Sequence, residues 1–458
     1  MIRIFNQYIP SRALILLAGE VAIISGSFAL AIVMQFGEGS SVMFHDSHTL
    51  WKIALIALLA FACSHFMELY DLQQLNRPNE MYTRVFVLVG ALSLLLAALT
   101  YFFPGLILGR RVFLAGLCIM SLTWVLWRWT YIHVFFHPAL LERVYVLGDG
   151  EHARRIVEAI RTRAELGMEL VGWTGEEGEG PSNSESIAHT LRDLENLGAV
   201  KRVIVAMTNR RSVMPVNELL DLRLSGVRVE DGTTLLEKIS GKIEIDELRP
   251  SWLIFRDGFR LAPRYWFWRR IVSTLLASTL SIITLPLIPI IVILIKLSSS
   301  GPVLYKQRRA GFRGQTFYCY KFRTMRADAE ADSGPTWATD DDPRITKVGK
   351  ILRRMRLDEI PQLWNILRGD MAFVGPRPER PEFVAQLSAV IPYYGLRHLT
   401  RPGLTGWAQI NYGYGSSVEE AKEKLRYDLY YLRNVSVMLD LVIVFYTMRA
   451  VLIGRGVR

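Results

Sequence analysis

The sequence has only three cysteines among its 458 residues: Cys63, Cys118 and Cys319. They are scattered and lack metal-ligand spacing, so the sequence supports neither a disulfide framework nor a zinc site. No signal peptide with a cleavage site opens the chain, and we expect the first apolar run to stay uncleaved. Lysine and arginine are missing from the loop between Gly37 and Leu50, which bears on membrane orientation.

Apolar residues and positive charge are abundant. The chain is 51% hydrophobic with a net charge of +11, and its length suggests about three domains. A basic balance of this size indicates an anionic partner: nucleic acid, a phospholipid surface or a phosphorylated substrate. The long apolar runs favour the membrane and phosphate interpretations over nucleic acid.

Residues 1–138 are predicted to form a four-helix transmembrane bundle. The candidate spans are residues 13–36, 51–69, 85–103 and 112–135, each of a length suited to a hydrocarbon core of ~30 Å. Arginines flank the predicted cytoplasmic ends, at Arg3, Arg12, Arg77, Arg84 and Arg143, and the opposite loop has none. This asymmetry places both ends of the bundle in the cytoplasm, although Arg110 and Arg111 oppose it.

Four ionisable residues lie in or near the spans: Glu20, His65, Glu68 and Arg128. Such groups within a membrane are often functional. Nothing around them resembles a site, so we expect structural roles, with Glu20 pairing inside the bundle or across a dimer.

Residues 139–250 alternate short apolar strands with helices. Strands are predicted at 143–147, 171–173, 203–206 and 227–229, and helices at 153–166, 186–197 and 215–225. The alternation predicts a parallel, doubly wound α/β sheet. The turn Gly148-Asp149-Gly150 followed by Ala153 is weak evidence for dinucleotide binding, because no acidic residue follows the second strand in the proper setting. A structural or regulatory role is favoured over cofactor binding.

A linker at residues 251–264 leads to an apolar segment, residues 267–297. Trp266, Arg269 and Arg270 are suited to a lipid headgroup zone. Pro286 and Pro289 are predicted to break the segment near its middle, since proline removes a helix hydrogen bond. A kinked fifth span and a re-entrant helix are both compatible with this pattern.

The stretch Arg353–Glu379 is the most informative part of the chain. Asp358 is placed to cap a helix, with Glu359 in its first turn and Pro361 early in it. An apolar helical patch follows at Leu363, Trp364, Ile366 and Leu367. The surrounding cations offer more hydrogen-bond donors than two carboxylates can accept. They are Arg353, Arg354, Arg356 and Arg377. We therefore expect an anion to bind between them.

Further motifs flank this stretch in a fixed order. They are Lys306-Gln307-Arg308-Arg309-Ala310-Gly311, Tyr320-Lys321-Phe322-Arg323-Thr324-Met325 and Arg401-Pro402-Gly403-Leu404-Thr405-Gly406-Trp407-Ala408-Gln409. Together with Asp358-Glu359 and the Gly375-Pro376-Arg377-Pro378 turn, residues 265–458 resemble the bacterial sugar transferases, the monotopic phosphoglycosyl transferases. Members of that family move a hexose-1-phosphate from a nucleotide sugar to a polyprenyl phosphate.

The resemblance implies a multidomain membrane protein of the bacterial inner membrane with its catalytic domain on the cytoplasmic face. A transmembrane bundle, a Rossmann-like α/β accessory domain and an α+β catalytic domain with a re-entrant membrane helix would follow one another. A kinked fifth span would put the catalytic domain outside the cell, away from nucleotide sugars, so the re-entrant alternative is favoured. Pro286 matches the family's break position, while Pro289 is additional.

The resemblance also assigns roles to residues. Asp358 would be the nucleophile, Glu359 would hold Mg²⁺, and Arg353 would neutralise phosphate oxygens. Arg377, next to Pro376, would clamp the nucleotide or phosphate. Further substrate-binding candidates are Lys321, Arg323, Arg401, Thr405 and Gln409.

Other polar residues of the catalytic domain are expected to be structural. Asp370 is expected to fix the turn after Gly369. Tyr427, Asp428, Tyr430 and Tyr431 are expected to pack on the core, with Asp428 pairing to an arginine. Residues 437–453, which include Asp440 and Arg449, fit an amphipathic helix on the membrane better than a span.

Two other functions were weighed against this one. A direct glycosyltransferase would release UDP rather than UMP, and a membrane receptor would bind a nucleotide through residues 143–250 without turnover. The density of motifs after Lys306 argues against both. The favoured partners are a UDP-hexose, such as UDP-glucose or UDP-galactose, polyprenyl phosphate and membrane lipid, with a homodimer plausible. The product would initiate exopolysaccharide, capsule or O-antigen synthesis.

Overall fold

A computed structural model describes the chain over residues 2–4, 7–9, 11–45, 47–67, 69, 78–106, 109–135, 137–163, 166–175, 191, 200–207, 214–248, 263–326, 342–413 and 417–453. The chain forms two compact units. Met1–Arg3 and Tyr8–Leu235 make up the first, and Ile4–Gln7 and Leu236–Arg458 the second. Three predictions fall wholly or mostly outside the described residues: Glu68, the helix at 186–197 and the linker at 251–264.

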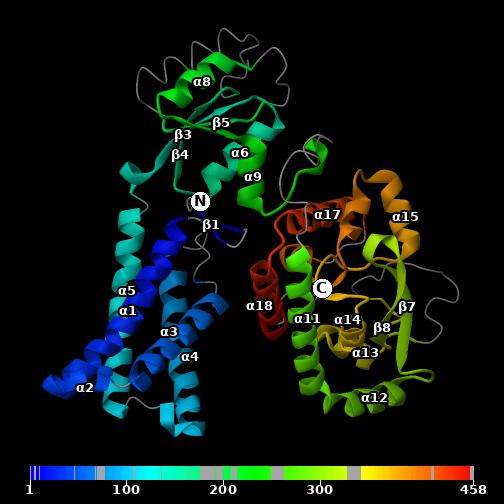
Figure 1. Ribbon diagram of the computed structural model, residues 1–458, viewed down its shortest axis with the longest axis horizontal. Coiled ribbons are helices and arrows are strands. Elements are labelled where there is room, and N and C mark those ends of the chain that lie inside the picture. The colour runs from blue at the N-terminus through cyan, green and yellow to red at the C-terminus, as the bar shows by residue number, and fades with distance from the viewer. Residues whose placement is uncertain are drawn as a thin grey trace. The chain divides into compact units, whose positions relative to one another are not determined.

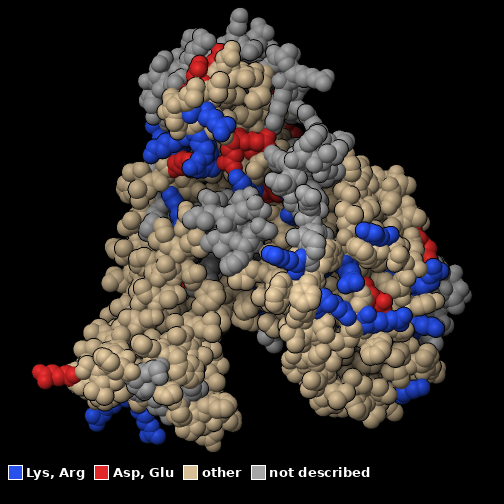
Figure 2. All heavy atoms as spheres, in the orientation of Figure 1, with Lys and Arg blue, Asp and Glu red and all other residues tan. Residues whose placement is uncertain are grey.

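Four apolar helices dominate the start of the first unit. They are α1 (Ser11–Phe36), α3 (Ser47–Phe66), α4 (Pro78–Phe102) and α5 (Arg110–Phe135). All are long and apolar enough to cross a membrane, and they overlap the four predicted spans. A short helix, α2 (Ser40–His45), lies between α1 and α3. Figure 1 shows α1 against α5. On the face seen in Figure 2, the described residues between the two ends of the bundle are mostly uncharged.

A buried ion pair joins α1 to α5. Arg128 Nη2 lies 2.5 Å from Glu20 Oε1, and both side chains are almost fully enclosed. Trp124 Nε1 donates to the same oxygen, and Arg128 Nη1 donates to the Leu69 carbonyl. The two charges therefore satisfy each other within one bundle, which is how ionisable groups are tolerated at membrane depth.

The α/β domain follows the bundle. Its described elements are β3 (Glu142–Leu147), α6 (Glu151–Thr162), β4 (Met168–Trp173), β5 (Arg202–Val205), α8 (Val216–Leu224), β6 (Arg228–Asp231) and α9 (Gly232–Ser240). The strands are all parallel in the order β4-β3-β5-β6. The central strands are apolar from Val144 to Leu147 in β3 and from Val203 to Val205 in β5 because parallel sheets are covered on both faces.

The second unit is α+β. Its helices are α11 (Pro263–Thr284), α12 (Leu287–Ser298), α13 (Lys347–Arg354), α14 (Gln362–Arg368), α15 (Pro381–Val390), α16 (Trp407–Asn411), α17 (Val418–Arg433) and α18 (Val437–Ile453). Strands β7 (Leu304–Ala310) and β8 (Thr316–Phe322) form an antiparallel pair, and β9 (Ala372–Val374) pairs in parallel with β10 (Gly403–Thr405). These short strands support the loops of the candidate site.

The apolar segment bends between α11 and α12. The two helices meet at an angle of 65°, and the interruption falls at Leu285-Pro286. Pro286 is the N-cap residue of α12, whereas Pro289 lies in the first turn of α12 and does not interrupt it. A first-turn residue has no intrahelical N–H partner to lose, so proline is tolerated there.

Arg269 and Arg270, which the sequence suggested for a headgroup zone, direct their guanidinium groups to partners within the protein. Arg269 is 3% exposed and donates to Thr400 and to the Val374 carbonyl. Arg270 donates to the carbonyls of Ile366 and Leu367, at the end of α14, at 2.6 and 2.7 Å. The carbonyls of a last helical turn lack intrahelical partners, and this guanidinium supplies them.

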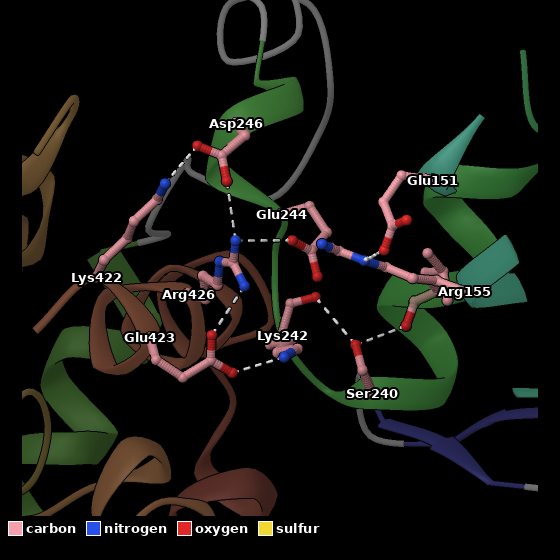
Figure 3. Close-up of polar contacts among 10 residues, drawn as sticks. Glu151, Arg155, Ser240, Lys242, Glu244, Asp246, Lys422, Glu423 and Arg426 are labelled. Carbon is pink, nitrogen blue, oxygen red and sulfur yellow. Dashed lines mark hydrogen bonds and ion pairs between the residues drawn. The ribbon is translucent and has the colours of Figure 1, made fainter. Parts of the chain in front are cut away.

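Residues 236–248 belong to the second unit, although the predicted boundary gave them to the α/β domain. Ile243 and Ile245 are buried beside Phe383 and Leu429. Acidic and basic groups reinforce this contact, as Figure 3 shows: Lys242 with Glu423, Arg426 with Glu244 and Asp246, and Lys422 with Asp246. Burial of these apolar side chains explains why residues 236–248 pack on the second unit rather than on the α/β domain.

Helix α18 differs from the predicted amphipathic helix. Its acidic residue, Asp440, is 5% exposed and accepts hydrogen bonds from Tyr431 and Tyr265. The exposed positions carry apolar side chains instead, at Met438, Leu441, Met448 and Val451. The carboxylate faces inward because two buried hydroxyls satisfy it, and α18 presents an apolar outer face.

Candidate active site

Asp358 and Glu359 lie in a short 3-10 turn, Leu357–Glu359, ahead of α14. The prediction that Asp358 caps this α-helix is therefore wrong: α14 begins at Gln362 with Pro361 as its N-cap residue. The turn is preceded by Arg356 in the left-handed conformation, with φ 55°. Such a conformation in a residue other than glycine is strained and is enriched at functional sites.

Helix α13 delivers Arg353 to the site. Thr346 caps its start by accepting a hydrogen bond from the Gly349 amide at 2.9 Å. Gly349 lies so close to the Thr324 carbonyl that a side chain at this position would collide with it. This close approach allows Arg353 Nε to donate to Thr324 Oγ1 at 2.9 Å.

Strand β8 delivers Lys321, and Asn365 fixes the strand against α14. Asn365 is fully buried; its amide nitrogen donates to the Tyr318 carbonyl, and its oxygen accepts from the Tyr320 amide. The same amide contacts Asp370 Oδ2 at 3.2 Å, so Asp370 fixes the turn after Gly369 as expected. Sequence reasoning missed Asn365. A signal was present, because asparagine is a poor residue for a helix interior unless its side chain has partners.

The Gly375–Pro378 turn delivers Arg377. Backbone hydrogen bonds join this turn to the Arg401–Gln409 motif, from Gly375 N to the Thr405 carbonyl and from Gly403 N to the Pro376 carbonyl. They extend the pairing of β9 with β10. The Arg401–Gln409 motif thus holds the Gly375–Pro378 turn in place.

Glu359 is held by two cations on one oxygen. Lys321 Nζ and Arg377 Nη2 each lie 2.6 Å from Glu359 Oε1. Burial raises the pKa of this carboxyl, but Arg377 and Lys321 outweigh burial and hold the pKa well below its usual 4.5. Glu359 is therefore an ionised, immobilised carboxylate.

Asp358 has a different environment although it is the adjacent residue. It is 8% exposed, and within the described part of the chain its carboxylate has no hydrogen-bond or ion-pair partner. Burial raises the pKa of Asp358, and Glu359 adds to this effect, while Lys321, Arg353 and Arg377 oppose it. Neighbouring carboxyls with pKa values pushed apart are typical of groups with separate chemical roles.

The Asp358-Glu359 pair supplies only part of the ligands that a Mg²⁺ ion needs, and this is compatible with a Mg²⁺ site. Among the described residues, no group of three or more His, Cys, Asp or Glu side chains is arranged around a metal position. Mg²⁺ sites that serve phosphate chemistry commonly use one or two carboxylates and complete the shell with water and substrate oxygens. Two adjacent carboxylates surrounded by lysine and arginine side chains meet that requirement.

The remaining predicted site residues are dispersed. Arg323 is 7% exposed and donates to the Ser299 carbonyl, at the end of α12. Thr405 is buried with its hydroxyl 2.6 Å from that of Thr447, and Gln409 donates to the Leu404 carbonyl. Arg401 has Arg270, Arg269 and Asp370 as its electrostatic neighbours. The structure therefore groups Asp358, Glu359, Lys321, Arg353 and Arg377, and gives Thr405 and Gln409 internal partners.

The apolar bundle is typical of a membrane protein. The carboxylate pair of the second unit, with cations around it, is typical of a site for phosphate chemistry. The family model described as "Bacterial sugar transferase" matches residues 264–454. The chain is 40% identical over 202 residues to the exopolysaccharide production protein ExoY of Sinorhizobium fredii, covering 87% of that protein and 41% of this chain. The chain belongs to the bacterial sugar transferase family.

Two longer relatives are also similar. A UDP-N-acetylgalactosamine-undecaprenyl-phosphate N-acetylgalactosaminephosphotransferase of Aeromonas hydrophila is 41% identical over 222 residues, which are 48% of this chain and 52% of that protein. A UDP-glucose:undecaprenyl-phosphate glucose-1-phosphate transferase of Escherichia coli is 33% identical over 319 residues, 66% of each chain. The similarity thus spans about half to two thirds of these relatives.

Replacing Lys321 by methionine tests the charge balance at Glu359. The folded-state pKa of Glu359 is depressed, so its ionised contacts stabilise the fold above about pH 4.5, and the stabilisation fades as the pH falls through the folded-state value. Lys321→Met should lower the melting temperature at pH 7.5. The difference in melting temperature between the variant and the parent protein should become smaller as the pH falls below 4.5.

Lys306→Met is the matched control, because Lys306 is an exposed lysine on the paired strand β7. Melting curves of both variants across pH 2–8 would measure the effect. A Lys321→Met difference that is the same at every pH would show that Lys321 stabilises the fold without acting through an ionised carboxylate.

Proposed function

We propose that the protein transfers a sugar-1-phosphate from a UDP-sugar to a polyprenyl phosphate through a covalent intermediate on Asp358. One observation supports this above all: a buried Asp358 carboxylate, which has no hydrogen-bond or ion-pair partner among the described residues, lies beside a Glu359 that two cations immobilise. A carboxylate that hydrogen bonds do not stabilise is a stronger nucleophile once it is ionised. Around it, Lys321, Arg353 and Arg377 offer positive charge to phosphate oxygens.

In the first step, an oxygen of Asp358 attacks the sugar-linked phosphorus of the donor. The bond from that phosphorus to the bridging oxygen breaks, and UMP leaves with the electron pair. Arg377 and Arg353 neutralise the phosphoryl oxygens as charge moves, because positioning and charge neutralisation account for most of the catalysis in phosphoryl transfer. Glu359 would hold Mg²⁺, which supplies additional positive charge at the diphosphate.

In the second step, a phosphate oxygen of the polyprenyl phosphate attacks the phosphorus of the adduct. The Asp358 oxygen–phosphorus bond breaks and restores the carboxylate. The product is a polyprenyl diphosphate sugar, the initiating unit for a polysaccharide. Dividing the transfer in this way lets the nucleotide leave before the lipid substrate reacts.

The two similar long relatives are named for different sugars, glucose and N-acetylgalactosamine. We keep a UDP-hexose as the favoured donor, and the test panel therefore contains UDP-glucose, UDP-galactose and UDP-N-acetylgalactosamine. Release of UDP in place of UMP would identify a direct glycosyltransferase instead.

The bent pair α11–α12 is proposed to enter and leave the same leaflet, on the cytoplasmic face of the inner membrane. The 65° bend, together with exposed apolar side chains on both arms such as Ile282, Ile283, Leu287 and Ile290, supports this arrangement. Lipid-facing backbone must keep its hydrogen bonds, and the break is short enough to satisfy that requirement.

Asp358→Asn should abolish turnover while the protein remains folded, because the amide cannot attack phosphorus. UMP release and intact mass would be measured with full-length protein, Mg²⁺ and the donor panel without lipid. The parent protein should release one equivalent of UMP and gain the mass of a sugar phosphate, with the adduct mapped to Asp358. An Asn variant that still turns over would rule out the nucleophile assignment.

Removing Mg²⁺ with EDTA should stop UMP release and should restore activity when Mg²⁺ is added back. Glu359→Gln should need more Mg²⁺ to reach half of its own maximal rate, because one hard oxygen ligand is lost. Full activity in EDTA, or an unchanged Mg²⁺ requirement in the variant, would contradict this role.

Single cysteines at Arg264 and Ser299, introduced after replacing the native cysteines, would test the membrane path. These positions lie at the two ends of the bent pair. Both should react with a membrane-impermeant thiol reagent from the same side of sealed vesicles. Labelling from opposite sides would establish a fifth span.

A further inference from the structure

The loop that carries Arg377 is held from outside the candidate site by other arginines. Arg397 Nη2 donates to the main-chain carbonyl of Arg377 at 3.0 Å. Arg309 Nη1 donates to the carbonyl of Pro378, also at 3.0 Å. The Arg377 side chain contacts Glu359 at the opposite end. The residue is thus fixed by its main chain on one side and its guanidinium on the other.

Arg397 is itself locked in place. It is 6% exposed; its Nη2 lies 2.9 Å from Asp428 Oδ2, and its Nη1 donates to the Tyr394 hydroxyl at 2.5 Å. Asp428, on α17, is 2% exposed; burial raises its pKa to about 6, and Arg397 opposes this rise. The predicted pairing of Asp428 with an arginine is confirmed.

A buried ion pair of this kind is weak evidence for stability, since well-packed apolar residues often serve as well. What the pair provides here is geometry. The same nitrogen of Arg397 contacts both the Asp428 carboxylate and the Arg377 carbonyl. A planar guanidinium held by an acid and a hydroxyl gives the carbonyl a donor whose direction is fixed.

We propose that Arg397 is a positioning residue for Arg377, with Asp428 setting the orientation of its guanidinium. Arg397 would act through the Arg377 main chain, so that the Arg377 side chain meets both Glu359 and the donor diphosphate. The inference rests on the proposed function, because it takes Arg377 to contact the donor. A displacement of about 1 Å at such a group is enough to slow catalysis by about a hundredfold.

The test compares Arg397→Gln with the parent protein in the full-length chain, using UMP release at varied donor concentration. The donor KM should rise about tenfold, because a displaced Arg377 would lose about one charge-assisted hydrogen bond to the donor, and Arg397→Lys should recover part of this loss. In an Arg377→Ala background, Arg397→Gln should have no further effect on the donor KM, because the side chain through which Arg397 acts is already absent.

Arg426→Gln is the matched control on the same helix as Asp428. It removes half-buried ion pairs to Glu244, Asp246 and Glu423 (Figure 3). It should lower the melting temperature while leaving the donor KM unchanged. If Arg397→Gln fails to fold, Asp428→Asn replaces it in the same comparison, with the same expected loss of effect in the Arg377→Ala background.

Additive effects of Arg397→Gln and Arg377→Ala on the donor KM would overturn the inference, and so would a rise of equal size in Arg426→Gln. These outcomes leave the proposed transfer intact. An unchanged donor KM in Arg377→Ala alone would instead remove the donor-binding role of Arg377 from the proposed function, and the inference about Arg397 would fall with it.

Discussion

The candidate site depends on one oxygen atom, Glu359 Oε1, which accepts from Lys321 and Arg377 together. The two cations come from unrelated elements, strand β8 and the loop after β9, so the carboxylate joins both to the 3-10 turn that precedes α14. The charges are partly screened from water, and their attraction is correspondingly stronger than on an open surface. Because Lys321 and Arg377 both bind Glu359, neither makes an ion pair with the neighbouring Asp358, which has no such partner among the residues that the structure describes. The two acids therefore differ in environment because the Glu359 side chain is the one that reaches both cations.

Helix α11 and the candidate site are joined by two arginines. Arg269 and Arg270, in the first half of α11, donate to the Val374 carbonyl just before the Arg377 loop and to the last carbonyls of α14. Both contacts are made to main chain, which moves less than side chains do. Insertion of α11 in a bilayer would consequently fix the height of the site relative to the lipid surface, where a polyprenyl phosphate must present its headgroup.

Sequence patterns predicted the long elements and the central charges well. The apolar runs predicted the bundle helices, and the alternation predicted the parallel strands. The family resemblance named Asp358, Glu359, Lys321, Arg353 and Arg377, which the structure groups, together with Arg323, Thr405 and Gln409, whose hydrogen bonds lie elsewhere. Contacts between distant side chains and backbone left no such pattern. Arg397 and Arg269 look like surface cations in the sequence, and only the fold shows them buried against carbonyls. The direction of Asp440 was missed for the same reason: its partners Tyr265 and Tyr431 are distant in the chain or on another helix.

The segment 236–248 has a consequence for how the chain can be divided. The family match begins at residue 264, yet Ile243 and Ile245 complete a hydrophobic cluster with Phe383, Leu387 and Leu429. A polypeptide shortened to start at Arg264 would uncover that apolar surface and leave Lys422 and Arg426 without the acids of the missing segment. Exposed apolar patches of this kind promote self-association. A fragment that keeps the core of the second unit intact should therefore begin near Leu236.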